Sequence, residues 1–276
     1  MTTPSQVPAR FPSGVSTDYP WGPLANYGLP NPAFYQVAFT DFMSNASDLF
    51  ASGIGTGTGN AVTFPGTVDG GAWLLTTSTS GAGTSGVVGS YNEFFLPPLT
   101  YAGGNTLTGN RFPSKKVFYA TRINVTTVAT TAIWAGFVPA TFTGAAAPTD
   151  GVVINITNAT TGNLIAYSGS TVQWTVPIPL GAFTTYYANT TWVDLAIYID
   201  RLTNVYAFIG YPLFGWLPAS AWPSSTQPGP LGAVAAYQVG VSGAWTPTTA
   251  GLTPGLVATG TIQTAYVDFL FGAKER

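Results

Sequence analysis

The chain of 276 residues contains no cysteine and no histidine, only 7% charged residues, and a net charge of −2. The missing residue types exclude a disulfide framework, thiolate or histidine metal sites and a Ser-His-Asp triad. An ordinary soluble domain carries roughly 25% charged residues, and a surface with so little charge favours association. We therefore expect a subunit largely covered by neighbours, with a secreted polar β protein as the alternative.

Residues 1–40 are predicted to form an extended arm. Seven prolines rule out a helix and favour a polyproline-like path. Disordered segments are usually poor in aromatic residues, but this segment has seven of them. We expect the arm to dock on its own domain or on a neighbouring subunit. The candidate contact residues are Arg10, Phe11, Tyr19, Trp21, Tyr27, Phe34 and Tyr35.

Short elements are predicted after the arm. A short helix is expected over residues 40–50, where Thr40 or Asp41 can serve as its N-cap. Apolar and aromatic residues within a Gly/Thr/Ser-rich run then indicate short strands around residues 60–64, 72–77 and 89–95. The glycines between them mark turns and bulges.

Residues 116–216 contain the clearest strand patterns. Apolar residues alternate there, as in a strand with one buried face. A turn at residues 200–204 separates two such segments and predicts a hairpin. The residues expected to face the core are Val193, Leu195, Ile197, Ile199, Val205, Ala207 and Ile209, opposed by Asp194, Ala196, Tyr198, Asp200, Tyr206, Phe208 and Gly210.

Two further features complete the chain. Residues 211–231 are rich in proline and aromatic residues, and a structureless loop of that length usually has a function. Its candidate contact residues are Tyr211, Phe214, Trp216 and Trp222. In the final strand we expect Ala265, Val267, Phe269 and Phe271 on one face, with the terminal AKER in solvent.

About ten to twelve short strands, without a long helix or a fixed-period repeat, predict an all-β fold. The expected architecture is two antiparallel sheets packed face to face over residues 41–276. The start of the chain lacks an apolar run of signal-peptide length, and no apolar stretch is long enough to span a bilayer. We therefore expect folding in the cytoplasm and no membrane partner.

The charged residues favour a protein without catalysis, metal or cofactor. Lys115 and Lys116 are the only adjacent basic pair, which argues against a nucleic-acid groove. Glycoside hydrolysis needs two carboxylates across a cleft, but the E-x-D-x-E strand pattern is absent. Asp194 and Asp200 are expected to be solvated or capping residues. The Asp-Gly pairs at 150–151 and 69–70 are expected to make turns rather than bind calcium.

Several segments together resemble a known fold family. FYATRINV leading to WAGF, TDGVVINI, WVDLAIYID followed by VYAFIG, and the closing AYVDFLF are spaced along the chain as strands of one sandwich. This pattern resembles the jelly-roll, concanavalin-like β-sandwich of decoration or cement proteins of tailed bacteriophages, over roughly residues 60–272. Related sandwiches occur in laminin G-like modules and lectins. The resemblance concerns strand spacing and includes no catalytic signature.

The resemblance implies a non-enzymatic virion protein on the outer surface of a phage head. Such a protein would clamp adjacent subunits of the major capsid protein as a homo-oligomer, a trimer rather than a dimer. It implies capsid or neighbour contacts for residues 11–35 and trimer contacts for residues 211–231. The alternative is a lectin-like module of a phage head or tail that binds a host-surface glycan through exposed aromatic residues, although aromatic residues are also common anchors of protein interfaces.

Overall fold

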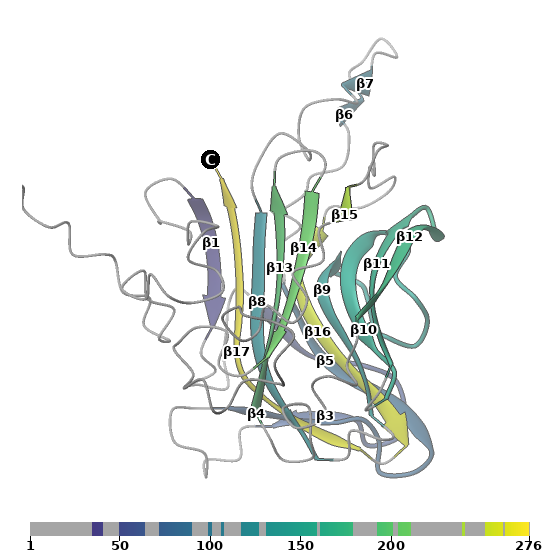
Figure 1. Cartoon of the computed structure of the whole chain (residues 1–276). Helices are drawn as coiled ribbons and strands as arrows, with labels where there is room; N and C mark the ends of the chain where they lie inside the picture. The colour runs from purple at the N-terminus through teal and green to yellow at the C-terminus, as the bar shows by residue number, and fades with distance from the viewer. Residues whose placement is uncertain are drawn as a thin grey trace, which may run out of the picture.

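The computed structural model describes thirteen stretches of the chain. They are residues 35–40, 50–63, 72–89, 99–100, 106–107, 117–126, 131–158, 161–178, 192–200, 204–210, 239–240, 252–261 and 263–275. All regular elements in these stretches are strands, and two antiparallel sheets pack against each other (Figure 1). The all-β jelly-roll sandwich predicted from the sequence is confirmed. The same stretches contain no helix long and apolar enough to cross a membrane.

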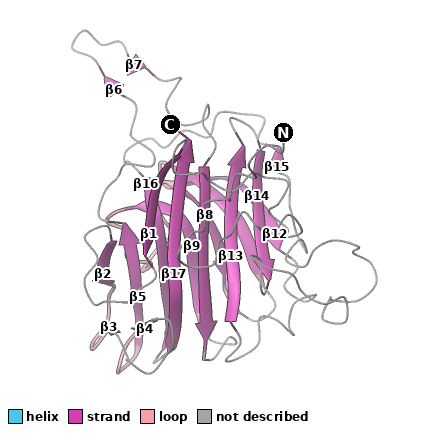
Figure 2. Ribbon diagram, turned by 90° about the vertical axis from the view of Figure 1, so that its left-hand side faces the viewer, coloured by secondary structure: helices cyan, strands magenta, loops and turns pink. Residues whose placement is uncertain are grey.

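The larger sheet has eight strands, and β17 lies near its centre (Figure 2). Along the sheet the strands are β15 (Val239–Gly240), β14 (Asn204–Gly210), β13 (Trp192–Asp200), β8 (Val117–Val125), β17 (Thr264–Glu275), β4 (Trp73–Thr76) and β3 (Ala61–Thr63). The first residues of β17 pair with β4. Its last residues pair with β1 (Tyr35–Thr40). β1 therefore lies on the same side of β17 as β4, opposite β8.

The smaller sheet has seven strands and lies behind the larger one. Its order is β12 (Thr171–Ile178), β11 (Gly162–Ser168), β10 (Gly151–Ile156), β9 (Ala132–Pro139), β16 (Leu252–Thr261), β5 (Ala82–Gly89) and β2 (Phe50–Ile54). The two-residue strands β6 (Leu99–Thr100) and β7 (Thr106–Leu107) form a separate ribbon.

The predicted hairpin is present, and it contributes to the core between the sheets. β13 and β14 pair antiparallel across the turn, with Asp200 opposite Asn204. All four residues that the alternation assigned to the buried face of β13 belong to the core cluster, as do Val205 and Ala207. Tyr119 links the two sheets directly, because its hydroxyl donates a hydrogen bond of 2.9 Å to the Gly255 carbonyl of β16.

One strand lies where the sequence indicated turns. β5 has the sequence AGTSGVVG, and its residues from Gly83 to Gly89 are buried. A Cβ added at Gly86 would come within 2.6 Å of the Leu256 carbonyl oxygen, so these strands approach too closely for a side chain at this position. The glycines of this run therefore serve strand packing. Of the predicted strand at 89–95, only Gly89 lies within the described residues, as do only the end residues Thr40 and Phe50 of the predicted helix.

A β-bulge in β17 changes which residues face the core. Its pairing with β8 shifts between Val267, opposite Ile123, and Phe269, opposite Arg122. Asp268 is the additional residue, and a bulge of this kind reverses the alternation beyond it. Ala265, Val267 and Leu270 therefore belong to the core between the sheets. The prediction that Phe269 and Phe271 share a face with Val267 is wrong, and so is the solvent position of Ala273, which is fully buried.

Candidate functional site

The larger sheet is buried on both of its sides along three central strands. Its outward face, which points away from the seven-stranded sheet, contains side chains of β8, β13 and β17. The residues of this outward face are Phe118, Ala120, Arg122, Asp194, Ala196, Tyr198, Asp268, Phe269, Phe271 and Ala273. The apolar members and Tyr198 are at most 4% exposed. The outward face is therefore a second buried layer, whereas the sequence pattern indicated one buried face for each strand.

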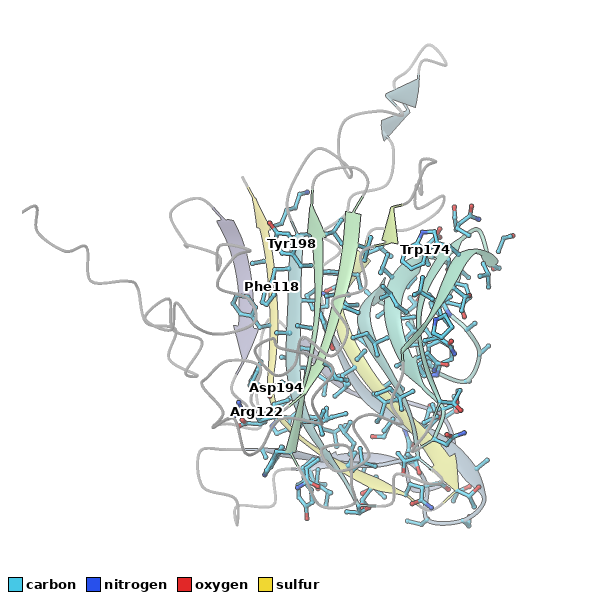
Figure 3. The ribbon with its side chains drawn as sticks, viewed as in Figure 1. Phe118, Arg122, Trp174, Asp194 and Tyr198 are labelled. Carbon is cyan, nitrogen blue, oxygen red and sulfur yellow. The ribbon has the colours of Figure 1, made fainter. Side chains whose placement is uncertain are left out.

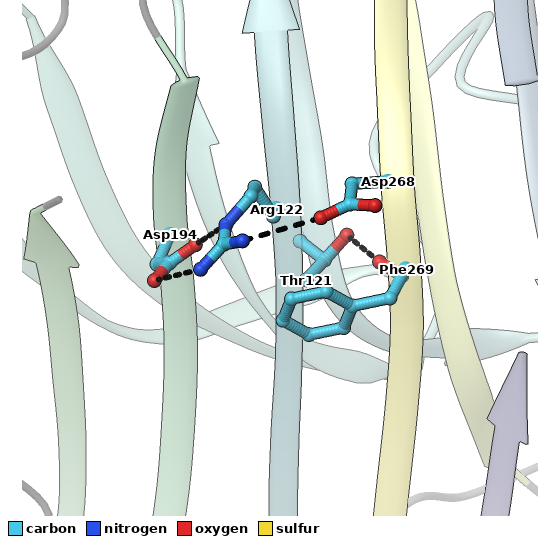
Figure 4. A network of polar contacts seen from close by, with 5 residues as sticks. All are labelled: Thr121, Arg122, Asp194, Asp268 and Phe269. Atoms are coloured by element: carbon cyan, nitrogen blue, oxygen red, sulfur yellow. Dashed lines mark hydrogen bonds and ion pairs between the residues drawn. The ribbon is translucent and has the colours of Figure 1, made fainter. Parts of the chain in front are cut away.

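Arg122 forms the centre of a polar network on this face (Figure 4). Its Nε donates to Asp194 Oδ1 at 2.6 Å, and a terminal nitrogen donates to Asp194 Oδ2 at 3.2 Å. The other terminal nitrogen lies 3.3 Å from Asp268 Oδ2. The guanidinium carbon lies 5.6 Å from the centre of the Phe269 ring. The two-point contact with Asp194 is the geometry in which arginine binds a carboxylate most strongly.

Burial differs among the three charged side chains. Asp194 is completely buried, whereas the side chains of Arg122 and Asp268 are 23% and 28% exposed. A buried carboxylate is tolerated only when it is paired and hydrogen-bonded. The expectation that Asp194 is a solvated or capping residue is therefore wrong. Arg122 supplies the opposite charge and two hydrogen bonds to this carboxylate.

The network connects three adjacent strands. Asp194 lies on β13, Arg122 on β8 and Asp268 on β17. Asp268 is the additional residue of the bulge in β17. From this position the Asp268 carboxylate lies 3.3 Å from the Arg122 guanidinium. Next to it, the Thr121 hydroxyl donates to the Phe269 carbonyl at 2.7 Å. These contacts fix the position of β17 relative to β8 at the point where the regular pairing is interrupted.

Above the network, the buried side chains of the outward face are aromatic rings and alanines. In Figure 3, Phe118 and Tyr198 lie above Arg122 and Asp194 on the same sheet. The rings of Phe118 and Phe271 meet edge to face with their centres 5.6 Å apart. This arrangement is favourable for aromatic pairs. The part of the outward face above Arg122 is therefore a packed aromatic layer.

A second aromatic cluster covers the outer side of the seven-stranded sheet. The ring centre of Trp134 lies 6.0 Å from that of Phe142 and 6.5 Å from that of Tyr167. Phe142 belongs to the turn that follows β9, and this turn folds back over the sheet. Burial raises the pKa of Tyr167. Trp134 is itself half-buried, so this cluster is partly accessible.

The edge strand β12 presents further apolar surface. Val172 is 49% exposed. Trp174 is half-buried, and its Nε1 has no hydrogen-bond partner among the described residues. A buried indole N–H usually has a partner. Trp174 packs against the core between the sheets, and its Nε1 atom is itself buried, so this donor is not presented to a ligand in solution.

Of the sequence-predicted contact residues, the structure places only Tyr35. Tyr35 begins β1 and pairs with Glu275. The other ten residues of the arm and of the 211–231 loop lie outside the described residues. The sequence analysis missed Arg122, Phe118 and Phe271 as members of a site. A usable signal was present, because Phe118, Ala120 and Tyr198 put apolar or aromatic groups at the supposed solvent positions of their strands.

Ligand groups for a metal ion do not gather in the described part of the chain. No group of three or more acidic residues there could hold such an ion. The three charged groups of the network satisfy one another, with one arginine between two carboxylates. The geometry therefore supports a structural role for these residues.

Comparisons with known proteins give likenesses in structure alone. No family model matches the sequence, and no curated protein matches it. A protein of unknown function from Shewanella oneidensis MR-1 is similar over 90% of this chain and 95% of its own, with 11% identity and a TM-score of 0.53. A β-1,3-1,4-glucanase from a mouse hindgut metagenome covers 87% of this chain and 99% of its own, with 12% identity and a TM-score of 0.47.

A module from a bacteriophage is also similar. It is the CBM2 module of the evolved Dit protein of Lactobacillus casei BL23 phage J-1, with 10% identity and a TM-score of 0.47. The likeness covers 87% of this chain and 96% of the module. At such low identity these similarities concern the β-sandwich fold.

Proposed function

We propose that this protein is a non-enzymatic structural protein of a bacteriophage virion. It decorates the outer surface of the head and cements it by bridging subunits of the major capsid protein. It acts as a homo-oligomer, a trimer rather than a dimer, after folding in the host cytoplasm. The strand spacing that resembles phage decoration proteins supports this proposal, and so does a surface with only 7% charged residues.

The observation that carries the proposal is the double burial of the larger sheet around Arg122. Three strands with both faces buried and an ion-pair network across them form a stiff plate. A cement protein must transmit force between capsid subunits without deforming. Each contact can be weak because many copies bind the same particle. A rigid scaffold with polar groups that satisfy one another suits this role better than a catalytic role.

Particle stability provides the test. Phage particles with and without this protein would be heated in parallel, and genome release would be followed with a DNA-binding dye. The proposal predicts release at lower temperature from particles that lack the protein, and recovery after the purified protein is added back. Equal release from both particles, or a protein that never co-purifies with particles, would refute it.

A carbohydrate-binding module is the second candidate, because of the half-buried Trp134 on the outer side of the seven-stranded sheet. Its ring centre lies 6.0 Å from that of Phe142 and 6.5 Å from that of Tyr167. Partly exposed aromatic rings are suitable for the apolar face of a sugar. A glycan array with the intact protein and Trp134→Ala would decide this candidate, with Trp174→Ala as the control because Trp174 packs against the core between the sheets. Binding lost in Trp134→Ala but kept in Trp174→Ala would support it, and an array without signal would refute it.

A further inference from the structure

The outward face of the larger sheet is covered, and no described strand covers it. Phe118, Phe269 and Phe271 are at most 2% exposed within a single copy of the chain. Among the described strands, β8, β13 and β17 contact their neighbours in the sheet and the seven-stranded sheet on the inner side. The layer over the outward face must therefore come from another part of the chain.

We propose that residues 1–34 of the same chain form this layer, docking on Phe118, Ala196, Tyr198, Phe269, Phe271 and Ala273. The assignment goes beyond the proposed function and does not depend on it. Of the two docking surfaces that the sequence left open, it selects the arm's own domain.

The first argument is position. The arm leads directly into Tyr35, which opens β1 and pairs with Glu275 at the end of β17. β1 continues along β17 until Thr40 lies opposite Leu270. In the same register Phe39 is the backbone partner of Phe271. Residue 34 therefore joins the sheet at the edge of the aromatic layer.

The second argument is reach. An extended chain spans at most roughly 3.3 Å per residue, or about 110 Å for 34 residues. The steps from β1 to β14 through β17, β8 and β13 number four, which is about 19 Å at the usual strand spacing. The arm is thus long enough to cross the face more than once, even along a path with several turns.

The third argument is chemical complementarity. The buried side chains of the outward face above Arg122 are aromatic rings and alanines. Residues 1–34 contain only two charged side chains, Arg10 and Asp18, together with seven prolines and five aromatic residues. An apolar arm can fill such a face without burying unpaired charge. Its prolines also reduce the conformational entropy that is lost on docking.

Photo-crosslinking of the full-length chain tests the assignment. Benzoylphenylalanine would replace Phe118 in one sample and Tyr198 in another, with equal amounts of unlabelled and ¹⁵N-labelled protein mixed before illumination. We expect crosslinks from both positions to peptides within residues 1–34 of the same isotopic form. Replacement at Tyr266 serves as the control, because it lies on β17 beyond Asp268 and is only half-buried. Crosslinks solely to other segments, or between isotopic forms, would overturn the proposal.

A second measurement covers the case in which the photoreactive group disturbs packing or gives no crosslink. The full-length double variant Phe11→Ser, Trp21→Ser would be compared with the parent protein by hydroxyl-radical footprinting. We expect oxidation to rise severalfold at Phe118 and Tyr198. Tyr119, next in sequence but on the core side, should stay protected and so report an intact fold. Unchanged oxidation at Phe118 and Tyr198 would overturn the proposal.

Discussion

Arg122 links three adjacent strands, β8, β13 and β17, through its side chain. It binds both oxygens of the fully buried Asp194 and reaches Asp268 at 3.3 Å. Removing one partner of a buried pair leaves the other charge without compensation, which commonly costs about 3–5 kcal/mol. Replacing both partners by apolar residues avoids that penalty.

The network therefore predicts a large coupling in a double-mutant cycle. Arg122→Met should lower the free energy of unfolding by about 3–5 kcal/mol, and the double variant with Asp194→Leu by clearly less. Asp268→Asn is the control, and we expect a loss of about 1 kcal/mol or less because that pair is part-exposed. Equilibrium unfolding in urea measures all five proteins, which are the parent, Arg122→Met, Asp194→Leu, the double variant and Asp268→Asn. Additive losses from the two single variants would contradict the coupling.

Tyr119 gives a prediction about pH. Its burial raises the pKa of its hydroxyl well above 10, and hydrogen bonds with Thr121 and Gly136 oppose that rise less strongly. The folded state thus holds the phenol proton when the unfolded state, with a pKa near 10, releases it. Stability from this residue is complete below pH 10 and decreases as the pH rises above it.

The comparison of Tyr119→Phe with the parent protein isolates this effect. At pH 7 the variant should lose about 1 kcal/mol, because the hydrogen bond to the Gly255 carbonyl is gone. From pH 10 to 11 the advantage of the parent protein should shrink by about 1 kcal/mol. Urea unfolding at pH 7, 9, 10 and 11 would show it. A difference that stays constant across this range would contradict the raised pKa.

At the level of elements, the bulge in β17 sets which side chains face the core. Asp268 is the additional residue, and Val267 and Phe269 keep their partners on β8 on either side of it. A deletion of Asp268 would leave a regular strand with the same residues facing inward. A deletion of Val267 would instead put the Asp268 carboxylate at a core position.

These two neighbouring deletions should therefore differ strongly. Without Asp268 the protein should fold with a loss of about 1 kcal/mol or less, which corresponds to the part-exposed pair with Arg122. Without Val267 the loss should exceed about 3 kcal/mol, because a charged group would enter the core. Thermal unfolding followed by circular dichroism distinguishes them. Similar melting temperatures for both deletions would show that the bulge does not determine which side chains of β17 face the core.

The sequence predicted those elements whose pattern follows the period of a strand without interruption. The hairpin of β13 and β14 is such a case, and its inward residues are correct from Val193 to Ala207, while the side chain of Ile209 lies outside the described part. β5 was missed because its glycines serve close packing, a requirement that is set by the neighbouring strand β16. The reversal after Val267 was missed because one additional residue in a strand leaves no mark in composition.

The site itself was harder to predict, for a physical reason. Alternation distinguishes the two faces of a strand, but it does not tell what covers the outer one. Asp194 was expected in solvent, although the apolar residues at neighbouring outward positions, Phe118 and Tyr198, indicated a second buried layer. The predicted contacts of the arm and of the 211–231 loop stay predictions, since apart from Tyr35 these residues lie outside the described stretches.

On the scale of the whole molecule, three properties bear on the proposed structural role. The sandwich has aromatic layers on the outer sides of both sheets. The sequence has few charges to keep copies apart. Its central strands are joined by an ion-pair network rather than arranged around free carboxylates. The structural role proposed above is consistent with all three.

A reconstruction of the phage particle by electron cryomicroscopy tests the central proposal most directly. We predict density for the sandwich on the outside of the head, in groups of three copies, with each group contacting more than one major capsid subunit. Density for the sandwich only at the tail, or particles without it, would contradict a role in cementing the head.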